Sequence, residues 1–320
     1  MSELRWHPLL QEWVITATHR QERTFFPPDD YCPLCPTKQG GFPTEVPLDD
    51  YKIVVFENKF PSLRSNSEPA VTSTDYSPVR PADGVCEVIC YTPDHQATLS
   101  DLSVEHIERL VEVWTDRFQE LSARPEVEYV FIFENKGKEI GVTLNHPHGQ
   151  IYAYPFIPPK VAIELAGSLK WFKEHGECLM CHIVESEIVE GTRIVETNDT
   201  WVSFVPFFAR YPYEVYVTPR THLGSLSDFS PQEKKDFARI LKSIAQKYDR
   251  LFGFSLPYMM VMHQTPSDGG EYGHYHFHVE FYPPHRDANK LKYLAGSEAG
   301  AGAFINDILP EETAERLRKL

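Results

Sequence analysis

The sequence has few positive charges and no long apolar run. Its 320 residues include 31 Lys and Arg against 46 Asp and Glu, which gives a formal net charge of −15. Binding along a nucleic-acid backbone requires clustered Lys and Arg, so we expect no extended nucleic-acid surface, although a few local groups could still hold a small nucleotide. Because no apolar run is long enough to span a membrane and residues 1–20 lack a cleavable signal pattern, we expect a cytoplasmic protein.

Cysteine is also scarce, and its placement is regular. The six cysteines occur as three pairs: Cys32/Cys35, Cys86/Cys90 and Cys178/Cys181. In a reducing cytosol, a CxxC pair indicates metal binding before a disulfide. The middle pair lies in a strand-like run instead, where buried small apolar side chains are the favoured interpretation.

Helix signals are clear in both halves of the chain. Apolar residues at three- and four-residue spacing predict an amphipathic helix over 100–121. A second helix is expected over 161–175, ended by Gly176, and a short one over 311–320. Ser230 and Glu233 form a capping box, with Pro231 at the first helical position of a further helix.

The second half of the chain repeats the first, with a period of about 128 residues. The matched segments are 32–35 with 178–181, 53–60 with 201–207, 88–95 with 215–222, 129–133 with 258–262, and 146–150 with 274–278. We therefore predict an α+β fold of two units, each a small antiparallel sheet with a packed helix, which form one body. The expected domains are residues 1–158 and 159–320.

Two sets of four side chains have the composition of a tetrahedral zinc site. Two thiolates and two imidazoles leave no open position, so such a site is structural. For the two histidines that follow the strands, a capped loop histidine is the alternative. The first set is Cys32, Cys35, His95 and His146, and the repeat predicts a second set of Cys178, Cys181, His222 and His274.

The segment from His146 to Gln150 reads as the start of a strand, because β-branched and aromatic residues flank it. Alternation in a strand places His146, His148 and Gln150 on one face. If His146 binds metal, the neutral imidazole of His148 can attack phosphorus and form an N-phosphoryl intermediate. Gln150 could then donate a hydrogen bond to a phosphate oxygen. Taken alone, a His-x-His pair more often indicates metal binding or packing.

Several motifs together carry a family resemblance over nearly the whole length. They are segments 13–15, 19–23, 32–35, 56–58, 93–95, 133–137, 146–150, 278–284 and 296–298. In these the chain resembles the galactose-1-phosphate uridylyltransferase family, a branch of the histidine-triad superfamily. The resemblance implies two histidine-triad-like repeats and a ping-pong transfer of UMP from UDP-glucose to His148 and then to galactose 1-phosphate, in galactose metabolism. It also implies a homodimer in which the C-terminal tail serves the partner's His148.

The same resemblance assigns further residues. Arg20, Arg23 and Asn58 fall where the family holds the nucleotide, Asn135 and Gln150 near its phosphates, and Lys292, Tyr293 and Glu298 at the sugar phosphate and sugar hydroxyls. Some members have an iron-type site as an alternative second metal site. Here Glu164, His263 and His278 match that site, and Glu280 replaces its last histidine.

Three other functions stay open at this point. Branches with a similar Gly-rich tail include an ADP-glucose phosphorylase-like group of adenylyltransferases, but these carry HSHSQ in place of HPHGQ. Water could also discharge the same intermediate, which would make the protein a nucleotide hydrolase. The third alternative is a non-catalytic, zinc-stabilised nucleotide-binding protein.

Overall fold

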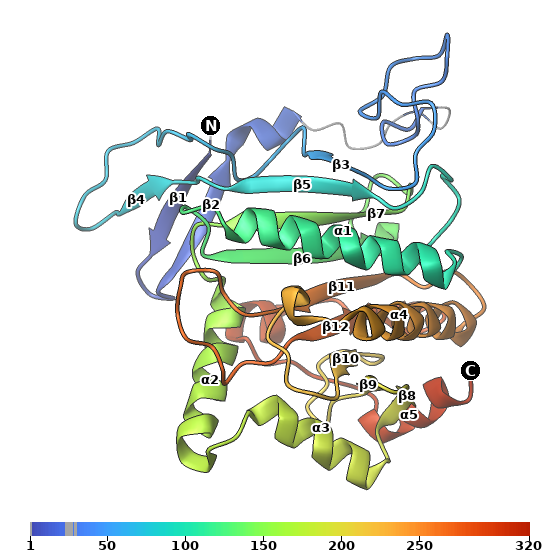
Figure 1. Cartoon of the computed structure of the whole chain (residues 1–320). Helices are drawn as coiled ribbons and strands as arrows, with labels where there is room; N and C mark the ends of the chain where they lie inside the picture. The colour runs from blue at the N-terminus through green and yellow to red at the C-terminus, as the bar shows by residue number, and fades with distance from the viewer. Residues whose placement is uncertain (1, 23–27, 29–30) are drawn as a thin grey trace.

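A nine-stranded antiparallel sheet runs through the middle of the molecule in the order β3-β5-β7-β6-β11-β12-β10-β9-β8 (Figure 1). The computed structural model describes residues 2–22, 28 and 31–320. The strands of this sheet are β3 (Val54–Glu57), β5 (Val85–Cys90), β6 (Tyr129–Lys136), β7 (His148–Tyr154), β8 (Ile194–Thr197), β9 (Trp201–Phe204), β10 (Val215–Pro219), β11 (Tyr258–His263) and β12 (His278–Tyr282).

The two halves of the chain meet where β6 pairs with β11. The register runs from Tyr258 opposite Lys136 to Met262 opposite Ile132, and the Nζ of Lys136 lies 2.9 Å from a carboxylate oxygen of Asp249. Strands of the first half lie on one side of this pair and strands of the second half on the other. The predicted α+β fold of two repeats in one body is therefore confirmed.

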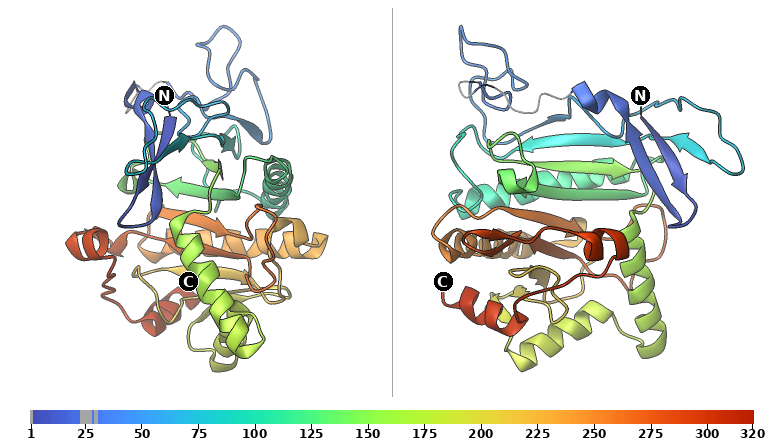
Figure 2. Two further views of the ribbon diagram at one scale, coloured as in Figure 1. Left: turned by 90° about the vertical axis from the view of Figure 1, so that its left-hand side faces the viewer. Right: turned by 180° about the vertical axis from the view of Figure 1, so that it is seen from behind.

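Two amphipathic helices cover the same face of the sheet (Figure 2). They are α1 (Val104–Ser122) and α4 (Pro231–Leu251), and both bury an apolar stripe against the strands. Ser103 caps α1, and the capping box of Ser230 and Glu233 starts α4 as predicted. Because each helix presents apolar side chains on one side only, this side fixes which face of the sheet it covers.

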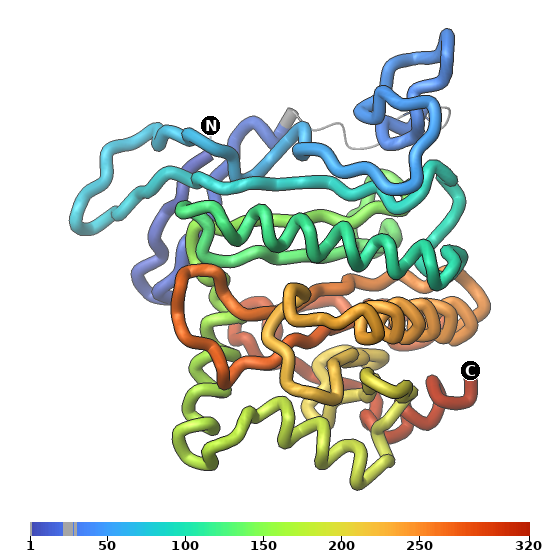
Figure 3. The backbone as a smooth tube through the Cα atoms, viewed as in Figure 1, coloured from blue at the N-terminus to red at the C-terminus, as the bar shows by residue number. Residues whose placement is uncertain are grey.

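The connection between the halves is α2 (Pro159–His175), which extends from the first half of the chain toward the second (Figure 3). It begins two residues before the predicted start and ends, as predicted, at Gly176, whose φ of 76° is left-handed. Two further helices follow, α3 (Leu179–Glu190) and α5 (Pro310–Arg318). Helix α3 was not predicted from the sequence.

The opposite face of the first half packs against a smaller sheet of β1 (Ser2–His7), β2 (Glu12–Ala17) and β4 (Val79–Pro81). A two-stranded ribbon of β13 (His285–Asp287) and β14 (Lys290–Leu291) follows the large sheet. In the part of the chain that the structure describes, no helix combines the length and the apolar character needed to cross a membrane.

Alternation along β7 separates core residues from site residues. Gly149, Ile151 and Ala153 are buried, the latter two in the core beneath α1, whereas His148 and Gln150 point to the other face. The sequence predicts that this strand begins at His146, but in the structure it begins at His148. His146 lies in the bend before the strand. The shared face of His148 and Gln150 agrees with the prediction.

Candidate active site and metal clusters

His148 is the first residue of β7, and a backbone carbonyl two residues earlier in the chain holds its ring. The Nδ1 of His148 lies 2.7 Å from the carbonyl oxygen of His146. Since a carbonyl oxygen only accepts, Nδ1 carries the hydrogen and donates it. In the neutral ring, Nε2 then has the lone pair, which is the tautomer that a nucleophilic histidine needs.

A cavity of about 410 Å³ lies on one side of His148, within the range of small-molecule sites, roughly 300–1,000 Å³. Its polar lining includes Arg20, Asn58 and Gln150, and Phe56 adds an apolar wall. Arg20 donates to the carbonyl oxygen of Phe60 at 2.8 Å, and Asn58 donates to Oε1 of Gln150 at 3.4 Å. The amide nitrogen of Gln150 is thus the group that can donate to a ligand.

A second cavity, of about 250 Å³, is also lined by His148. Asn135, Lys136, Gly137 and Ser255 contribute to its lining. His148 therefore takes part in the lining of two cavities, each of which has further polar groups in its lining.

Other predicted substrate residues lie elsewhere. Lys292 pairs with Glu298 at 3.0 Å, and Tyr293 is 76% exposed. None of these three residues lines either cavity beside His148. Arg23 lies outside the described residues.

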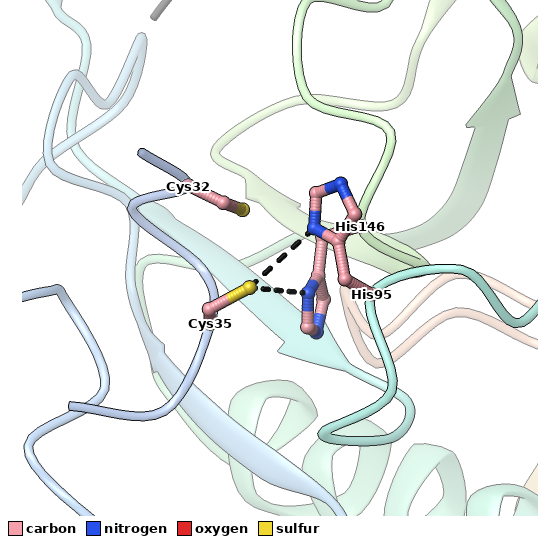
Figure 4. A group of neighbouring side chains, drawn as sticks. All are labelled: Cys32, Cys35, His95 and His146. Atoms are coloured by element: carbon pink, nitrogen blue, oxygen red, sulfur yellow. Dashed lines mark hydrogen bonds between the residues drawn. The ribbon is translucent and has the colours of Figure 1, made fainter. Parts of the chain in front are cut away.

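The first cysteine and histidine set is assembled as the sequence predicts (Figure 4): Cys32, Cys35, His95 and His146 converge. The Sγ of Cys35 lies 3.4 Å from Nδ1 of His95 and 3.5 Å from Nδ1 of His146. A tetrahedral zinc with bonds of about 2.3 Å to sulfur and about 2.0–2.1 Å to nitrogen separates such atoms by roughly 3.6 Å. The four donors thus have the spacing of a zinc site.

Hydrogen bonds also hold the second ring nitrogen of His146, Nε2, which does not face the cysteines. Its Nε2 donates to the carbonyl oxygen of Thr92 at 2.8 Å and lies 2.9 Å from the hydroxyl of Tyr51. Burial lowers the pKa of His146 to about 4, so the ring is neutral at pH 7 and its Nδ1 can bind a metal. Tyr51 was not singled out from the sequence, because nothing in the local pattern there indicates a contact with a residue so distant along the chain.

The second set contains one correction. Cys178, Cys181 and His222 come together as predicted, but the fourth member is His276 and not His274. The Sγ of Cys181 lies 3.3 Å from Nδ1 of His276 and 3.5 Å from Nδ1 of His222. Hydrogen bonds from Cys181, His222 and His276 lower the pKa of the Cys178 thiol well below its usual range and favour the thiolate.

His274 is instead packed between two aromatic rings, those of Phe172 and Tyr272. The hydrogen bonds show why: His276, and not His274, repeats His146. The Nε2 of His276 lies 3.1 Å from the carbonyl oxygen of Pro219, as that of His146 lies 2.8 Å from the carbonyl oxygen of Thr92. The repeat of Gln150 is therefore Glu280 and not His278.

His278 consequently repeats His148. Its Nδ1 lies 3.0 Å from the carbonyl oxygen of His276, as that of His148 lies near the carbonyl oxygen of His146. The position of the candidate nucleophile is thus occupied by histidine in both halves. Only the surroundings differ, because His278 is buried whereas His148 lines two cavities.

A third group surrounds His278: Glu164, His263, His278 and Glu280, the predicted alternative metal site. The Nδ1 of His263 lies 2.6 Å from Oε2 of Glu164. Burial opposes charge on His278, but its hydrogen bond to Glu280 and the charges of both carboxylates outweigh burial and raise its pKa. Three groups of the described residues could therefore hold a metal ion by composition.

The fold and the His148 strand define a duplicated α+β protein with a candidate catalytic histidine in its first repeat. Residues 1–158 match the model of the N-terminal domain of galactose-1-phosphate uridyl transferase, and residues 165–320 match that of its C-terminal domain. The chain belongs to this family.

Full-length relatives agree with this assignment. The galactose-1-phosphate uridylyltransferase of Thermotoga maritima is 45% identical, with 100% of this chain and 98% of that protein covered. A solved structure of uridylyltransferase is 36% identical, with a TM-score of 0.89 over 99% of this chain and 97% of that one. An ADP-glucose phosphorylase from Arabidopsis thaliana with bound ADP-glucose is 26% identical, with a TM-score of 0.77 over 100% of this chain and 99% of that one.

Gly149 is required by the close approach of Tyr91 beneath His148. A Cβ at this position would lie 2.3 Å from the Tyr91 hydroxyl and 3.2 Å from the Phe133 carbonyl oxygen. We expect Gly149→Ala to push β7 away from its neighbours and to lower the free energy of unfolding by about 1–3 kcal/mol. Thermal unfolding followed by circular dichroism measures this loss.

A matched control is Gly167→Ala in α2, where an added Cβ meets nothing within 4 Å. This substitution should leave stability unchanged or raise it by about 0.5–1 kcal/mol, because alanine favours a helix. In a Gly149→Ala background, Tyr91→Phe should recover part of the lost stability. Equal stability of the two glycine variants would contradict the packing argument.

Proposed function

We propose that this chain transfers UMP from UDP-glucose to galactose 1-phosphate through a covalent uridylyl-His148 intermediate, as a cytoplasmic enzyme of galactose metabolism. The observation that carries the proposal is the position of His148, which lines two cavities and has its Nδ1 hydrogen-bonded to the His146 carbonyl. The choice of substrates in this proposal is based on the full-length similarity to galactose-1-phosphate uridylyltransferases.

In the first half-reaction, Nε2 of His148 attacks the α-phosphorus of UDP-glucose. A nitrogen–phosphorus bond forms, the bond from that phosphorus to the bridging oxygen breaks, and glucose 1-phosphate leaves with the electron pair. The Nδ1–H of the resulting imidazolium stays hydrogen-bonded to the carbonyl of His146, which stabilises the developing positive charge. The amide nitrogen of Gln150 donates to a phosphate oxygen as negative charge builds up.

In the second half-reaction, a phosphate oxygen of galactose 1-phosphate attacks the same phosphorus. The nitrogen–phosphorus bond breaks, His148 recovers its lone pair, and UDP-galactose leaves. We propose that Arg20 and Asn58, which line the larger cavity, hold the uridine nucleotide throughout both steps, and that Arg23 contributes to the same binding. Asn135 lines the smaller cavity, where it would contact the phosphates.

The covalent intermediate is directly testable. Incubation with UDP-glucose alone should add one uridylyl group per chain, detected by intact-protein mass spectrometry, and His148→Ala should remain unmodified. His278→Ala is the matched control, because His278 repeats His148 but is buried; any folded His278→Ala protein should still be labelled. An unmodified wild-type protein would refute the assignment of the nucleophile.

The same assay separates the alternative functions. The likeness to an ADP-glucose phosphorylase is the observation that favours an adenylyl donor, so ADP-glucose is offered in parallel with UDP-glucose. Labelling by UDP-glucose and discharge by galactose 1-phosphate identify the uridylyltransferase. Discharge by water alone would identify a hydrolase, and exchange of labelled glucose 1-phosphate into UDP-glucose excludes a non-catalytic binding protein.

We propose that zinc binds to both sets of two cysteines and two histidines. Cys32, Cys35, His95 and His146 would tie the strand of His148 to the N-terminal segment, and the second set would tie α3 to β12. Zinc bound there leaves no open coordination position, so its contribution is structural. The predicted division at residues 158 and 159 gives each domain one such site.

If His276 and not His274 binds zinc, substitutions of these two histidines should differ in their effect on the zinc content. Elemental analysis should find two zinc ions per wild-type chain, and His276→Gln should lose one because its Nδ1 faces Cys178 and Cys181. His274→Gln should keep both, since its ring packs against Phe172 and Tyr272. The opposite pattern, or a single zinc in the wild type, would contradict the second site.

We propose a homodimer in which Lys292, Tyr293 and Glu298 reach the active site of the partner subunit. Their position supports this, since they line neither cavity beside His148 in the same chain and Tyr293 is 76% exposed. If these C-terminal residues bound substrate in their own subunit, we would expect them to lie beside the His148 of the same chain. In the proposed arrangement Lys292 contacts the sugar phosphate, while Tyr293 and Glu298 contact the sugar.

Complementation tests this sharing. His148→Ala and Lys292→Met should each have little activity alone, whereas co-refolded mixtures should recover roughly a quarter of the wild-type activity, since half of random dimers are mixed and each has one complete site. Sedimentation equilibrium checks the dimer. If the mixture stays inactive although mixed dimers form, the tail acts on its own subunit.

A further inference from the structure

The buried group around His278 contains a cation of its own. Lys160, in the first turn of α2, extends its ammonium group toward Glu280 and contacts both that carboxylate and the hydroxyl of Tyr282. The same nitrogen lies 3.6 Å from Oε1 of Glu164, one turn further along the helix. One ammonium group thus bridges the two carboxylates that a metal ion would need.

We propose that Lys160 closes the cluster of Glu164, His263, His278 and Glu280 as a fixed internal cation, and that this cluster therefore binds no metal ion. The family resemblance implies an iron-type ion here, so the proposal is a disagreement between this chain and that expectation. It concerns a site separate from His148 and does not depend on the proposed reaction.

The spacing of the donor atoms supports a directly bonded network. The Nδ1 of His263 lies 2.6 Å from Oε2 of Glu164, which is a hydrogen-bond distance. An ion bound at about 2.0–2.2 Å to both atoms would separate them by roughly 2.9 Å at a right angle and by roughly 3.4 Å in a tetrahedron. The two cysteine-containing clusters show the opposite pattern, since several of their donors are spaced as zinc requires.

The remaining carboxylate positions have hydrogen-bond donors as well. Tyr216 donates to Oε1 of Glu280, and Tyr275 donates to Oε2 of Glu164 at 2.7 Å. Each of the four oxygens therefore has a donor or an ammonium group next to it. A metal ion would have to displace these donors and lie beside the ammonium of Lys160, whose positive charge repels it.

The network also fills the space beside His278. Glu280, at the repeat position of Gln150, is fully buried, and the ring of Tyr216 stacks on His278 with centroids 5.5 Å apart. Side chains thus pack where the first half has a cavity beside His148. The network ties the start of α2 to β10, β11 and β12.

The test is a metal count on the whole protein. Wild-type protein and variants are incubated anaerobically with Fe²⁺, and separately with Co²⁺, then desalted and measured by elemental analysis and, for Co²⁺, by absorption of its d–d bands. Wild-type protein should hold only the metal of its cysteine-containing sites. Lys160→Met, which removes the ammonium group, should gain one further equivalent per chain with a spectrum free of thiolate charge-transfer bands.

Two variants control the result. Lys160→Arg keeps the positive charge and should not gain the ion, and Lys170→Met, at an exposed position of the same helix, should behave as the wild type. An additional thiolate-free equivalent in the wild type overturns the proposal without any variant. A folded Lys160→Met protein, verified by circular dichroism, that gains no ion shows that Lys160 is not what excludes the metal and also overturns it.

Discussion

The pairing of β6 with β11 is the constraint on which the rest of the molecule depends. It converts two small sheets into one sheet of nine strands, so that α1 and α4 pack side by side over a single core. Neither sheet could bury its central edge strand without the other, because unpaired backbone groups at such an edge are costly. The ion pair of Lys136 and Asp249 crosses the same junction.

The same strand position holds a histidine in both halves of this sheet, but its surroundings differ. His148 and His278 are repeats of each other, and both donate from Nδ1 to the carbonyl two residues earlier. In the first half the next residue on that face is an amide, Gln150, which faces a cavity. In the second half it is a carboxylate, Glu280, which is buried among cationic and hydroxyl donors. The side chains around the repeated histidine thus leave a cavity in the first half and fill the space in the second.

Local patterns predicted the regular elements well. The helices α1, α2 and α4, the end of α2 at Gly176, the capping box of α4, and the face shared by His148 and Gln150 follow from periodicity and capping chemistry, which act over a few residues. The choice between His274 and His276 could not be made this way. The segment 274–278 has histidine at three alternate positions, all on one face of an extended chain, so only pairing with β10 and β11 fixes which one meets the cysteines.

The sequence by itself determined the duplication, the α+β class, the two cysteine pairs of metal type, and the shared face of His148 and Gln150, because each depends on residue type and spacing along the chain. Tertiary structure decided which distant side chains meet. Three features arise where separate elements pack: the contact of Tyr51 with His146, the bridge of Lys160 to Glu280, and the two cavities lined by His148. Spacing along the chain does not indicate such contacts.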